Sequence, residues 1–131
     1  MENNTFKQNT LKTDNELIAE FMGGAISTGR VIFQTPPLFH NCNWDVNHLV
    51  YHRSWDWLMP VVEKIESLRM VHGGSNLTFS VEIHRNGCRI YRSWTTVDHP
   101  HFGWNQTGDK LRSTYKAVVD FIKWYNSQQN D

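Results

Sequence analysis

A carboxylate and an imidazole, those of Glu82 and His84, alternate with apolar residues in one short stretch of the chain. A positioned carboxylate and histidine can exchange protons with a substrate, which is the chemistry of general acid–base catalysis. The same alternation also predicts a half-buried strand whose polar face meets water. We interpret the pair first as that solvated face. A small hydrolase that uses Glu82 with His84 or His99 remains one hypothesis.

Seven histidines in 131 residues raise the question of a metal site. His99 and His101 form a His-x-His pair in a segment that we predict to be a loop. Zinc needs three or four converging ligands, and the chain has no Cys-x-x-Cys pair or Cys/His cluster at ligand spacing. We therefore expect no metal and no cofactor.

The two cysteines, Cys42 and Cys88, are expected to be reduced thiols. The N-terminal stretch is polar and Asn-rich, and it lacks the charged-then-apolar pattern of a signal peptide. Cys88 together with a histidine could form a nucleophilic pair. No signature of a cysteine enzyme surrounds Cys88, so we interpret it as a packed side chain.

Aromatic and basic side chains are interleaved in several polar segments of the chain. Aromatic rings stack on bases and arginine pairs with phosphate bidentately, so this mixture is typical of a pocket for a small anionic or nucleotide-type ligand. Packing of a Trp-rich core and its rim explains part of the same pattern. The candidate ligand-binding residues are Trp44, His52, Arg53, Arg89, Tyr91, Arg92, Trp94 and Trp104. No catalytic residue is assigned.

The length and the charge balance limit the classes of partner. Thirteen Lys and Arg offset thirteen Asp and Glu. A duplex-binding domain has a basic face and a high pI, so we expect no duplex nucleic acid, although a local basic patch remains compatible with the totals. No apolar run is long enough for a membrane helix, so we expect no membrane partner. We predict a flexible arm over residues 1–12 and a single α+β domain over residues 13–131.

The first predicted helix follows a capping box, in which Thr13 caps the helix and Glu16 reaches back. The pair Gly23-Gly24 then ends it. A second helix is predicted over residues 54–69, with a proline at position 60 that kinks the helix or lies in its first turn.

The third predicted helix spans residues 109–127 and has a wide apolar face. Phe121 and Trp124 broaden that face beyond what one sheet needs. A wide contact with the core explains this width, and so does a dimer surface or a ligand wall. The surplus apolar area leads us to expect a homo-oligomer.

Residues 77–83 alternate between apolar and polar side chains, which predicts a half-buried strand, and residues 88–95 form the returning strand. Asn86-Gly87 is the favoured type I′ turn between them. The register that follows pairs Ile83 with Ile90, Val81 with Arg92 and Phe79 with Trp94. Residues 30–34 are a candidate third strand for this hairpin, and residues 39–45 and 97–108 are predicted to be loops.

These elements predict the α+β class. A small antiparallel sheet, built on the central hairpin, packs with three helices in two layers or in an ABA sandwich.

Three segments resemble small phage proteins. Residues 15–23 resemble the short first helix of small phage and prophage proteins, and residues 54–66 resemble their central helix with Trp and Val-Val-Glu-Lys. Residues 115–126 are similar to the closing helix of a group of uncharacterised Bacteroidetes and phage proteins. The order of elements also resembles that of the phage ABA-sandwich family.

The resemblance implies an accessory protein of a bacteriophage or mobile element that acts in the cytoplasm of a bacterial host. Small phage proteins of this kind often block host defence, and some sequester cyclic-nucleotide or ADP-ribose-type signals between subunits. The group has no established catalytic residues, so none is transferred to this chain.

Three hypotheses for function follow. The first is a non-enzymatic binding protein that holds a small anionic or nucleotide-type ligand and sequesters a host defence signal. The second is a protein–protein adaptor or inhibitor that binds a host enzyme through an aromatic surface. The third is the His/Glu hydrolase.

Overall fold

The computed structural model describes residues 13–33, 43–72, 75–92 and 102–129. The chain divides into two compact units, Met1–Val50 and Tyr51–Asp131, and each is described by itself. Helices and small antiparallel sheets occur together, so the predicted α+β class is confirmed. The predicted arm over residues 1–12 lies outside the described residues.

The described part of the first unit begins with helix α2 (Asp14–Phe21), and the N-terminus of this helix carries the predicted capping box. The Glu16 N–H donates to Thr13 Oγ1 at 3.2 Å, and the Thr13 N–H donates to Glu16 Oε1 at 3.1 Å. These two bonds satisfy N–H groups that have no partner within the helix. Gly23 follows the helix with a φ of 99°, a left-handed conformation that glycine adopts without strain, so the predicted stop is also confirmed.

A three-stranded antiparallel sheet completes the first unit. Its strands are β1 (Gly24–Ser27), β2 (Arg30–Phe33) and β3 (Asn43–Asp45), and the 3-10 turn η1 (Val46–His48) follows. Strand β2 pairs with β1 and β3, so the prediction that residues 30–34 extend the central hairpin is wrong. The loop predicted over residues 39–45 is also wrong at β3.

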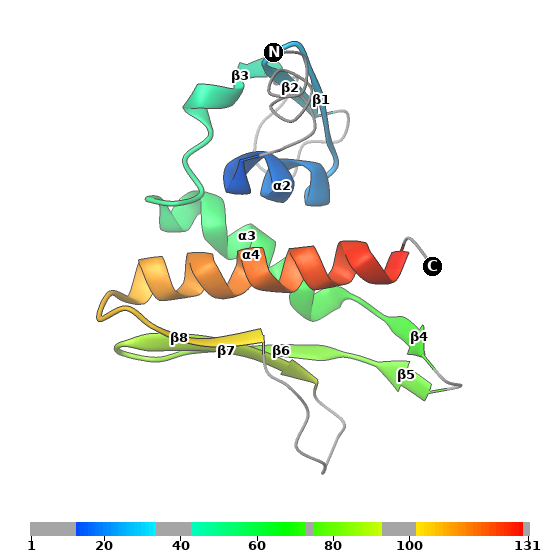
Figure 1. Cartoon of the computed structure of the whole chain (residues 1–131), viewed down its shortest axis with the longest axis vertical. Helices are drawn as coiled ribbons and strands as arrows, with labels where there is room; N and C mark the ends of the chain where they lie inside the picture. The colour runs from blue at the N-terminus through cyan, green and yellow to red at the C-terminus, as the bar shows by residue number, and fades with distance from the viewer. Residues whose placement is uncertain (1–12, 34–42, 73–74, 93–101, 130–131) are drawn as a thin grey trace, which may run out of the picture. The chain divides into compact units, whose positions relative to one another are not determined.

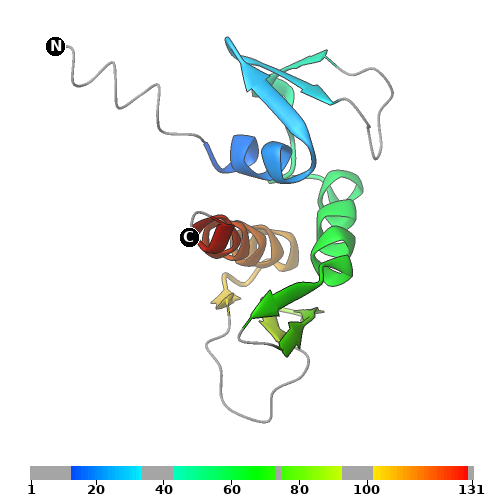
Figure 2. The ribbon, with the colours of Figure 1, turned by 90° about the vertical axis from the view of Figure 1, so that its right-hand side faces the viewer.

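In the described part of the second unit, helices lie on one side of a three-stranded sheet. Its described helices are α3 (Trp55–Ser67) and α4 (Lys110–Gln129), and the sheet consists of β6 (Phe79–Ile83), β7 (Gly87–Arg92) and β8 (Phe102–Gln106). Helix α3 contacts β6, and α4 contacts β7 and β8. Figures 1 and 2 show both helices on the same side of this sheet, which is the two-layer alternative.

A two-stranded ribbon, β4 (Met70–His72) and β5 (Ser75–Leu77), connects α3 to β6. Helix α3 ends at Ser67 and not at residue 69: Leu68 is its extended C-cap, and β4 begins at Met70. Pro60 lies inside α3, beyond its first turn, and is half-buried.

The central hairpin forms as predicted, but its predicted register is wrong by two residues. The His84 N–H donates to the Gly87 carbonyl at 2.7 Å, so residues 85 and 86 are at the tip of the turn. Among the described non-glycine residues only Thr28 has a positive φ, which excludes the type I′ turn. The observed pairs are Phe79 with Arg92, Val81 with Ile90 and Ile83 with Cys88.

The third strand explains this shift. Gly87 pairs with Gln106 and Cys88 pairs with Asn105 of β8, so Gly87 is a strand residue and cannot serve the turn. The loop predicted over residues 97–108 is accordingly wrong at β8. A shift of two residues leaves every side chain on its face, because side chains in a strand alternate with a period of two. The predicted partner Trp94 lies outside the described residues.

The core of the second unit lies between the sheet and the helices α3 and α4. The Phe79 and Phe121 rings meet edge to face with 4.9 Å between centroids, and Trp124 lies 5.9 Å from Phe79. Phe121 is 0% exposed and Phe79 is 3% exposed. This is the wide core contact that the sequence allowed for Phe121 and Trp124. No helix among the described ranges is both long and apolar enough to span a membrane.

Replacement of Phe121 by alanine tests this core. We expect Phe121→Ala to lower the free energy of unfolding by about 3–5 kcal/mol, because it leaves a cavity beside Phe79. The matched control is Asn126→Ala, which truncates an exposed residue on the same helix and should change the free energy by less than about 0.5 kcal/mol. Urea unfolding followed by circular dichroism measures both, and equal effects would contradict the assignment of the core.

Candidate functional site

Four polar side chains meet at one carboxylate on the sheet, and we call them the Glu82 cluster: Glu82, His84, Arg89 and Tyr91. Arg89 Nε donates to Glu82 Oε1 at 2.7 Å, and the Tyr91 hydroxyl donates to Glu82 Oε2 at 2.7 Å. His84 Nε2 lies 3.2 Å from Glu82 Oε1. The guanidinium of Arg89 also lies over the Tyr91 ring, 5.3 Å from its centroid.

Strand pairing brings these side chains together. Glu82 of β6 pairs directly with Arg89 of β7, and Ser80 pairs with Tyr91. Their alternation with Phe79, Cys88 and Ile90, which are buried, places them on the face turned away from the helices. The exposed fractions of the side chains are 32% for Glu82, 38% for Arg89 and 47% for His84. The cluster is therefore accessible to a ligand.

Hydrogen bonding keeps the central carboxylate ionised. The bonds from Arg89, Tyr91 and His84 lower the pKa of Glu82 to about 2, with Arg89 the largest cause. The same carboxylate raises the pKa of Tyr91 and the pKa of Arg89. A carboxylate of this kind is a poor proton acceptor at neutral pH. Its role is to orient the three donors around it.

Cys88 does not contribute to this face. It is 0% exposed on the helix side of β7, and burial raises the pKa of its thiol to about 11. Reactive cysteines have low pKa values in electropositive, accessible surroundings, so the environment fits the predicted packed side chain. Cys42, His99 and His101 lie outside the described residues. Within the described ranges, no three His, Cys, Asp or Glu side chains converge as a metal site would require.

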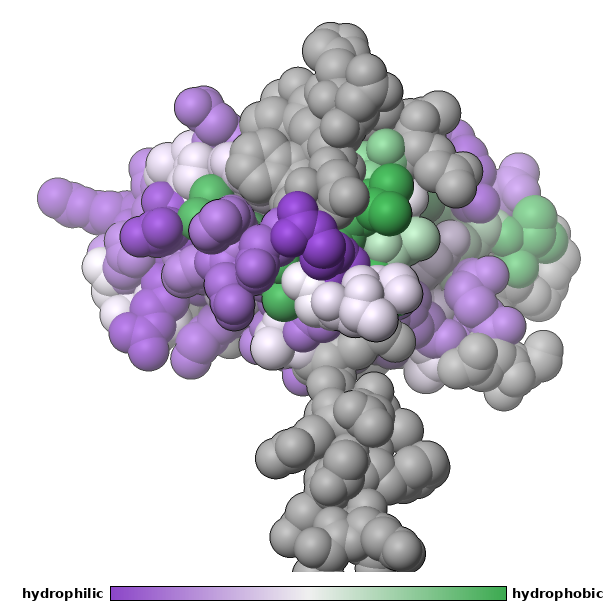
Figure 3. All heavy atoms as spheres, turned by 90° about the horizontal axis from the view of Figure 1, so that it is seen from above, coloured by the Kyte–Doolittle hydropathy of each residue, from purple (hydrophilic) through white to green (hydrophobic). Residues whose placement is uncertain are grey.

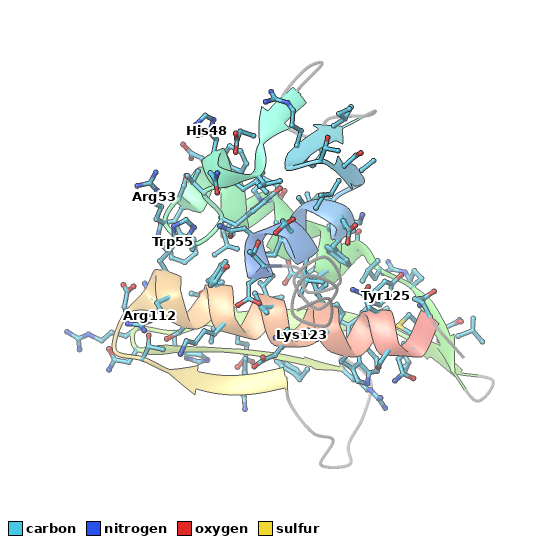
Figure 4. The ribbon with its side chains drawn as sticks, turned by 45° about the horizontal axis from the view of Figure 1, so that its top comes forward. His48, Arg53, Trp55, Arg112, Lys123 and Tyr125 are labelled. Atoms are coloured by element: carbon cyan, nitrogen blue, oxygen red, sulfur yellow. The ribbon has the colours of Figure 1, made fainter. Side chains whose placement is uncertain are left out.

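A second group of residues lies where the start of α3 approaches α4. We call His52, Arg53, Arg112, Tyr115 and Lys116 the basic–aromatic patch. The His52 and Tyr115 rings meet with 6.2 Å between centroids, which joins the turn before α3 to α4. Arg112, Tyr115 and Lys116 occupy positions i, i+3 and i+4 of α4, which lie on one helix face. Figure 4 shows Arg53 and Arg112 projecting on the same side of the unit, with Trp55 beside Arg53.

The cations of this patch have no acidic partner in the described part of the chain. None of the three cations, Arg53, Arg112 and Lys116, forms an ion pair there, and all three are exposed. Asp109 also lies at this end of α4, but its Oδ2 accepts the Arg112 backbone N–H at 3.1 Å and so caps the helix. Like charges at i and i+4 repel each other and destabilise a helix slightly. The patch thus carries local positive charge in a chain whose formal net charge is zero.

The predicted ligand residues whose side chains are described in the second unit lie at three places. Arg89 and Tyr91 belong to the Glu82 cluster, while His52 and Arg53 belong to the basic–aromatic patch. Arg92 lies on the other face of β7 with its guanidinium over Trp124, 5.6 Å from the ring centroid. The remaining predicted residues are placed as follows: Trp44 is in β3 of the first unit, Trp104 is in β8, and Trp94 is outside the described residues.

Sequence reasoning missed three members of the patch, Arg112, Tyr115 and Lys116. Their spacing on the last helix was a usable signal, because it predicts a basic face with an aromatic ring. The apolar stripe of the same helix is longer and gives the stronger pattern.

Comparisons with protein families, with curated proteins and with solved structures find no match to this chain. The resemblance to small phage proteins, and the expected bacterial cytoplasm, therefore stay predictions.

The lowered pKa of Glu82 predicts a pH dependence of stability. A carboxyl whose pKa is lower in the folded state stabilises the fold above its unfolded pKa, and this contribution disappears as the pH falls through the folded pKa. We expect Glu82→Gln to be less stable than the wild type at pH 7, and the difference to shrink between pH 4.5 and about 2. Unfolding in urea at a series of pH values measures it.

The matched control is Glu63→Gln, which removes an exposed carboxylate of α3 that forms no ion pair within the described residues. A pH-independent difference for Glu82→Gln, or an equal effect in the control, would contradict a stabilising role for the three hydrogen bonds.

Proposed function

We propose that this protein binds a small nucleotide-type anion at the basic–aromatic patch. The observation that carries the proposal is a group of three exposed cations, Arg53, Arg112 and Lys116, that have no acidic partner within the described residues and lie next to His52 or Tyr115 in sequence or on the same helix face. Positive charge of this kind is stabilised by a bound anion.

The chemistry of the patch supports a ligand with both a phosphate and a planar ring. Guanidinium groups bind phosphate oxygens bidentately, and this geometry distinguishes phosphate from a simple halide ion. The rings of His52 and Tyr115, and of half-exposed Trp55, are surfaces on which a base stacks. Inorganic phosphate would contact only the guanidinium groups, and a nucleoside would contact only the rings. A nucleotide contacts both.

The Glu82 cluster supports tight anion binding less well. Its carboxylate is ionised and repels an anion, while Arg89 and Tyr91 already donate to it. A ligand held by Arg89 would have to compete with a charge-assisted bond of 2.7 Å. The patch is therefore the better binding site for a stable anionic complex.

The resemblance to small phage proteins favours a host signal as the ligand, and sequestration of that signal as the role. An aromatic adaptor surface has weaker support. The exposed large apolar side chains of the described residues, Ile32, Met59 and Val71, lie on three different elements. Figure 3 shows that hydrophobic atoms on the face in view are scattered among hydrophilic ones.

Replacement of the two patch arginines tests the site. We expect the double variant Arg53→Ala/Arg112→Ala to bind a fluorescent adenosine diphosphate roughly 10- to 100-fold more weakly, because each arginine loses hydrogen bonds to a charged group. Arg69→Ala is the matched control, because it removes an exposed arginine beyond the C-terminal end of α3. Fluorescence anisotropy measures the three dissociation constants.

Competition experiments separate the contribution of the phosphate from that of the base. Adenosine and inorganic phosphate should each displace the probe much less well than adenosine diphosphate does. Equal binding by the double variant and the wild type would refute the site. Native mass spectrometry of protein purified from bacterial cells then shows whether a bound mass and a dimer are present, as sequestration between subunits requires.

A further inference from the structure

The Glu82 cluster contains groups for proton transfer and for stabilising an anionic transition state. His84 is an exposed imidazole held by a carboxylate at 3.2 Å, and Arg89 and Tyr91 supply a guanidinium and a hydroxyl beside it. In acid–base enzymes a carboxylate partner fixes the orientation of the histidine ring. Such a group of side chains suits a reaction in which negative charge develops on the substrate, because preorganised donors stabilise that charge in the transition state.

Ser80 and Cys88 are the side chains of these strands whose chemical type suits a nucleophile. The Ser80 hydroxyl shares the face of the cluster and hydrogen-bonds Tyr91. Cys88 lies on the opposite face, buried against Thr114 of α4. A reaction at this cluster therefore takes its nucleophile either from water or from the substrate itself. RNA supplies one within the substrate, because each internal phosphodiester has a 2′-hydroxyl beside it, and attack from that position needs no oriented water.

We propose that the Glu82 cluster cleaves RNA by transfer of the phosphodiester to the adjacent 2′-hydroxyl. His84 takes the proton of that hydroxyl at Nδ1, and the 2′-oxygen forms a bond to phosphorus. The bond from phosphorus to the 5′-oxygen breaks, and this oxygen receives the proton of the Tyr91 hydroxyl. Tyr91 regains a proton from His84 through solvent. The products are a 2′,3′-cyclic phosphate and a 5′-hydroxyl, and no metal or other reactant is consumed.

The charge balance of the cluster fits catalysis better than tight binding. Arg89 is paired with Glu82, so the cluster has little net charge to offer a phosphodiester in its ground state. Charge develops on the phosphoryl oxygens in the transition state, and the Arg89 guanidinium can stabilise it through N–H groups other than the Nε–H that binds Glu82. An enzyme gains rate only from interactions that strengthen at that point. The activity goes beyond the proposed nucleotide binding and does not depend on the basic–aromatic patch.

Glu82 is the positioning residue in this scheme. It holds His84 and Arg89 through Oε1 and Tyr91 through Oε2, so one carboxylate sets the orientation of the base, the acid and the cation. Glu82→Gln should therefore lower kcat and leave the KM for RNA nearly unchanged. Glu82→Asp keeps the charge and should restore part of kcat. Because a smaller folded fraction would also lower the apparent kcat at unchanged KM, kcat is divided by the folded fraction of each variant, measured by circular dichroism.

The test uses a short mixed-sequence RNA oligonucleotide with a fluorescent label, incubated with the full chain in the presence of EDTA. We expect cleavage with 2′,3′-cyclic phosphate ends, and no cleavage of the same sequence as 2′-O-methyl RNA. His84→Gln and Tyr91→Phe should each lower the rate by roughly 100-fold or more. His48→Gln is the matched control, because it replaces an exposed histidine outside the cluster and should leave the rate unchanged.

His84 is 47% exposed, so its replacement is expected to leave the fold intact, and circular dichroism verifies this. The proposal is overturned if the wild type does not cleave RNA, if the products carry a 3′-hydroxyl and a 5′-phosphate, or if His84→Gln cleaves at the wild-type rate. Binding of adenosine diphosphate by the same preparations reports separately on the basic–aromatic patch, so failure of one function is distinguishable from failure of the other.

Discussion

The contact between Phe79 and Phe121 is the interaction on which the second unit depends. Two large rings meet with 4.9 Å between centroids, and both are almost fully removed from water. Each buried aromatic ring removes a large apolar area from water and so contributes strongly to stability. Because Phe79 must face α4, every alternate residue of β6 faces the other way. Burial of one face therefore determines where Glu82 and its partners lie.

Helix α4 has a second consequence for the surface. Its apolar stripe packs on the sheet, with Val118, Phe121 and Ile122 fully buried, and this fixes the rotation of the helix about its axis. Arg112 and Lys116 are left exposed on its first turns, where the turn before α3 brings Arg53 and His52. One stripe of the helix thus packs in the core, and another carries the cations of the basic–aromatic patch. The two polar sites of the unit differ in kind, since one is charge-balanced and the other carries excess positive charge.

The sequence predicted local structure well where a local interaction decides it. The capping box of Thr13 and Glu16, the glycine stop after α2 and the apolar stripe of α4 each depend on neighbours within one helical turn. The alternation in β6 likewise predicted which residues share a face. For the site, the sequence named Arg89, Tyr91, His52 and Arg53 as ligand candidates but could not group them, because grouping depends on strand register and on helix packing. The sequence also suggested Glu82 and His84 as an acid–base pair. It does not reveal that Arg89 and Tyr91 bind the same carboxylate, because these contacts depend on strand pairing.

The sequence by itself determined the α+β class, the positions of the helices and the polarity of each face, because these follow from propensity, capping and periodicity along the chain. Only the tertiary structure decided the partners. The pairing of β2 with β1 and β3, the addition of β8 to the hairpin, and the shift that makes Gly87 a strand residue all depend on hydrogen bonds between distant segments. Asn86-Gly87 favours a type I′ turn locally, yet the bonds of Gly87 and Cys88 to β8 outweigh that preference. The position of Glu82 opposite Arg89 follows from the same pairing, and so the chemistry of the sheet face was fixed by contacts that no local pattern records.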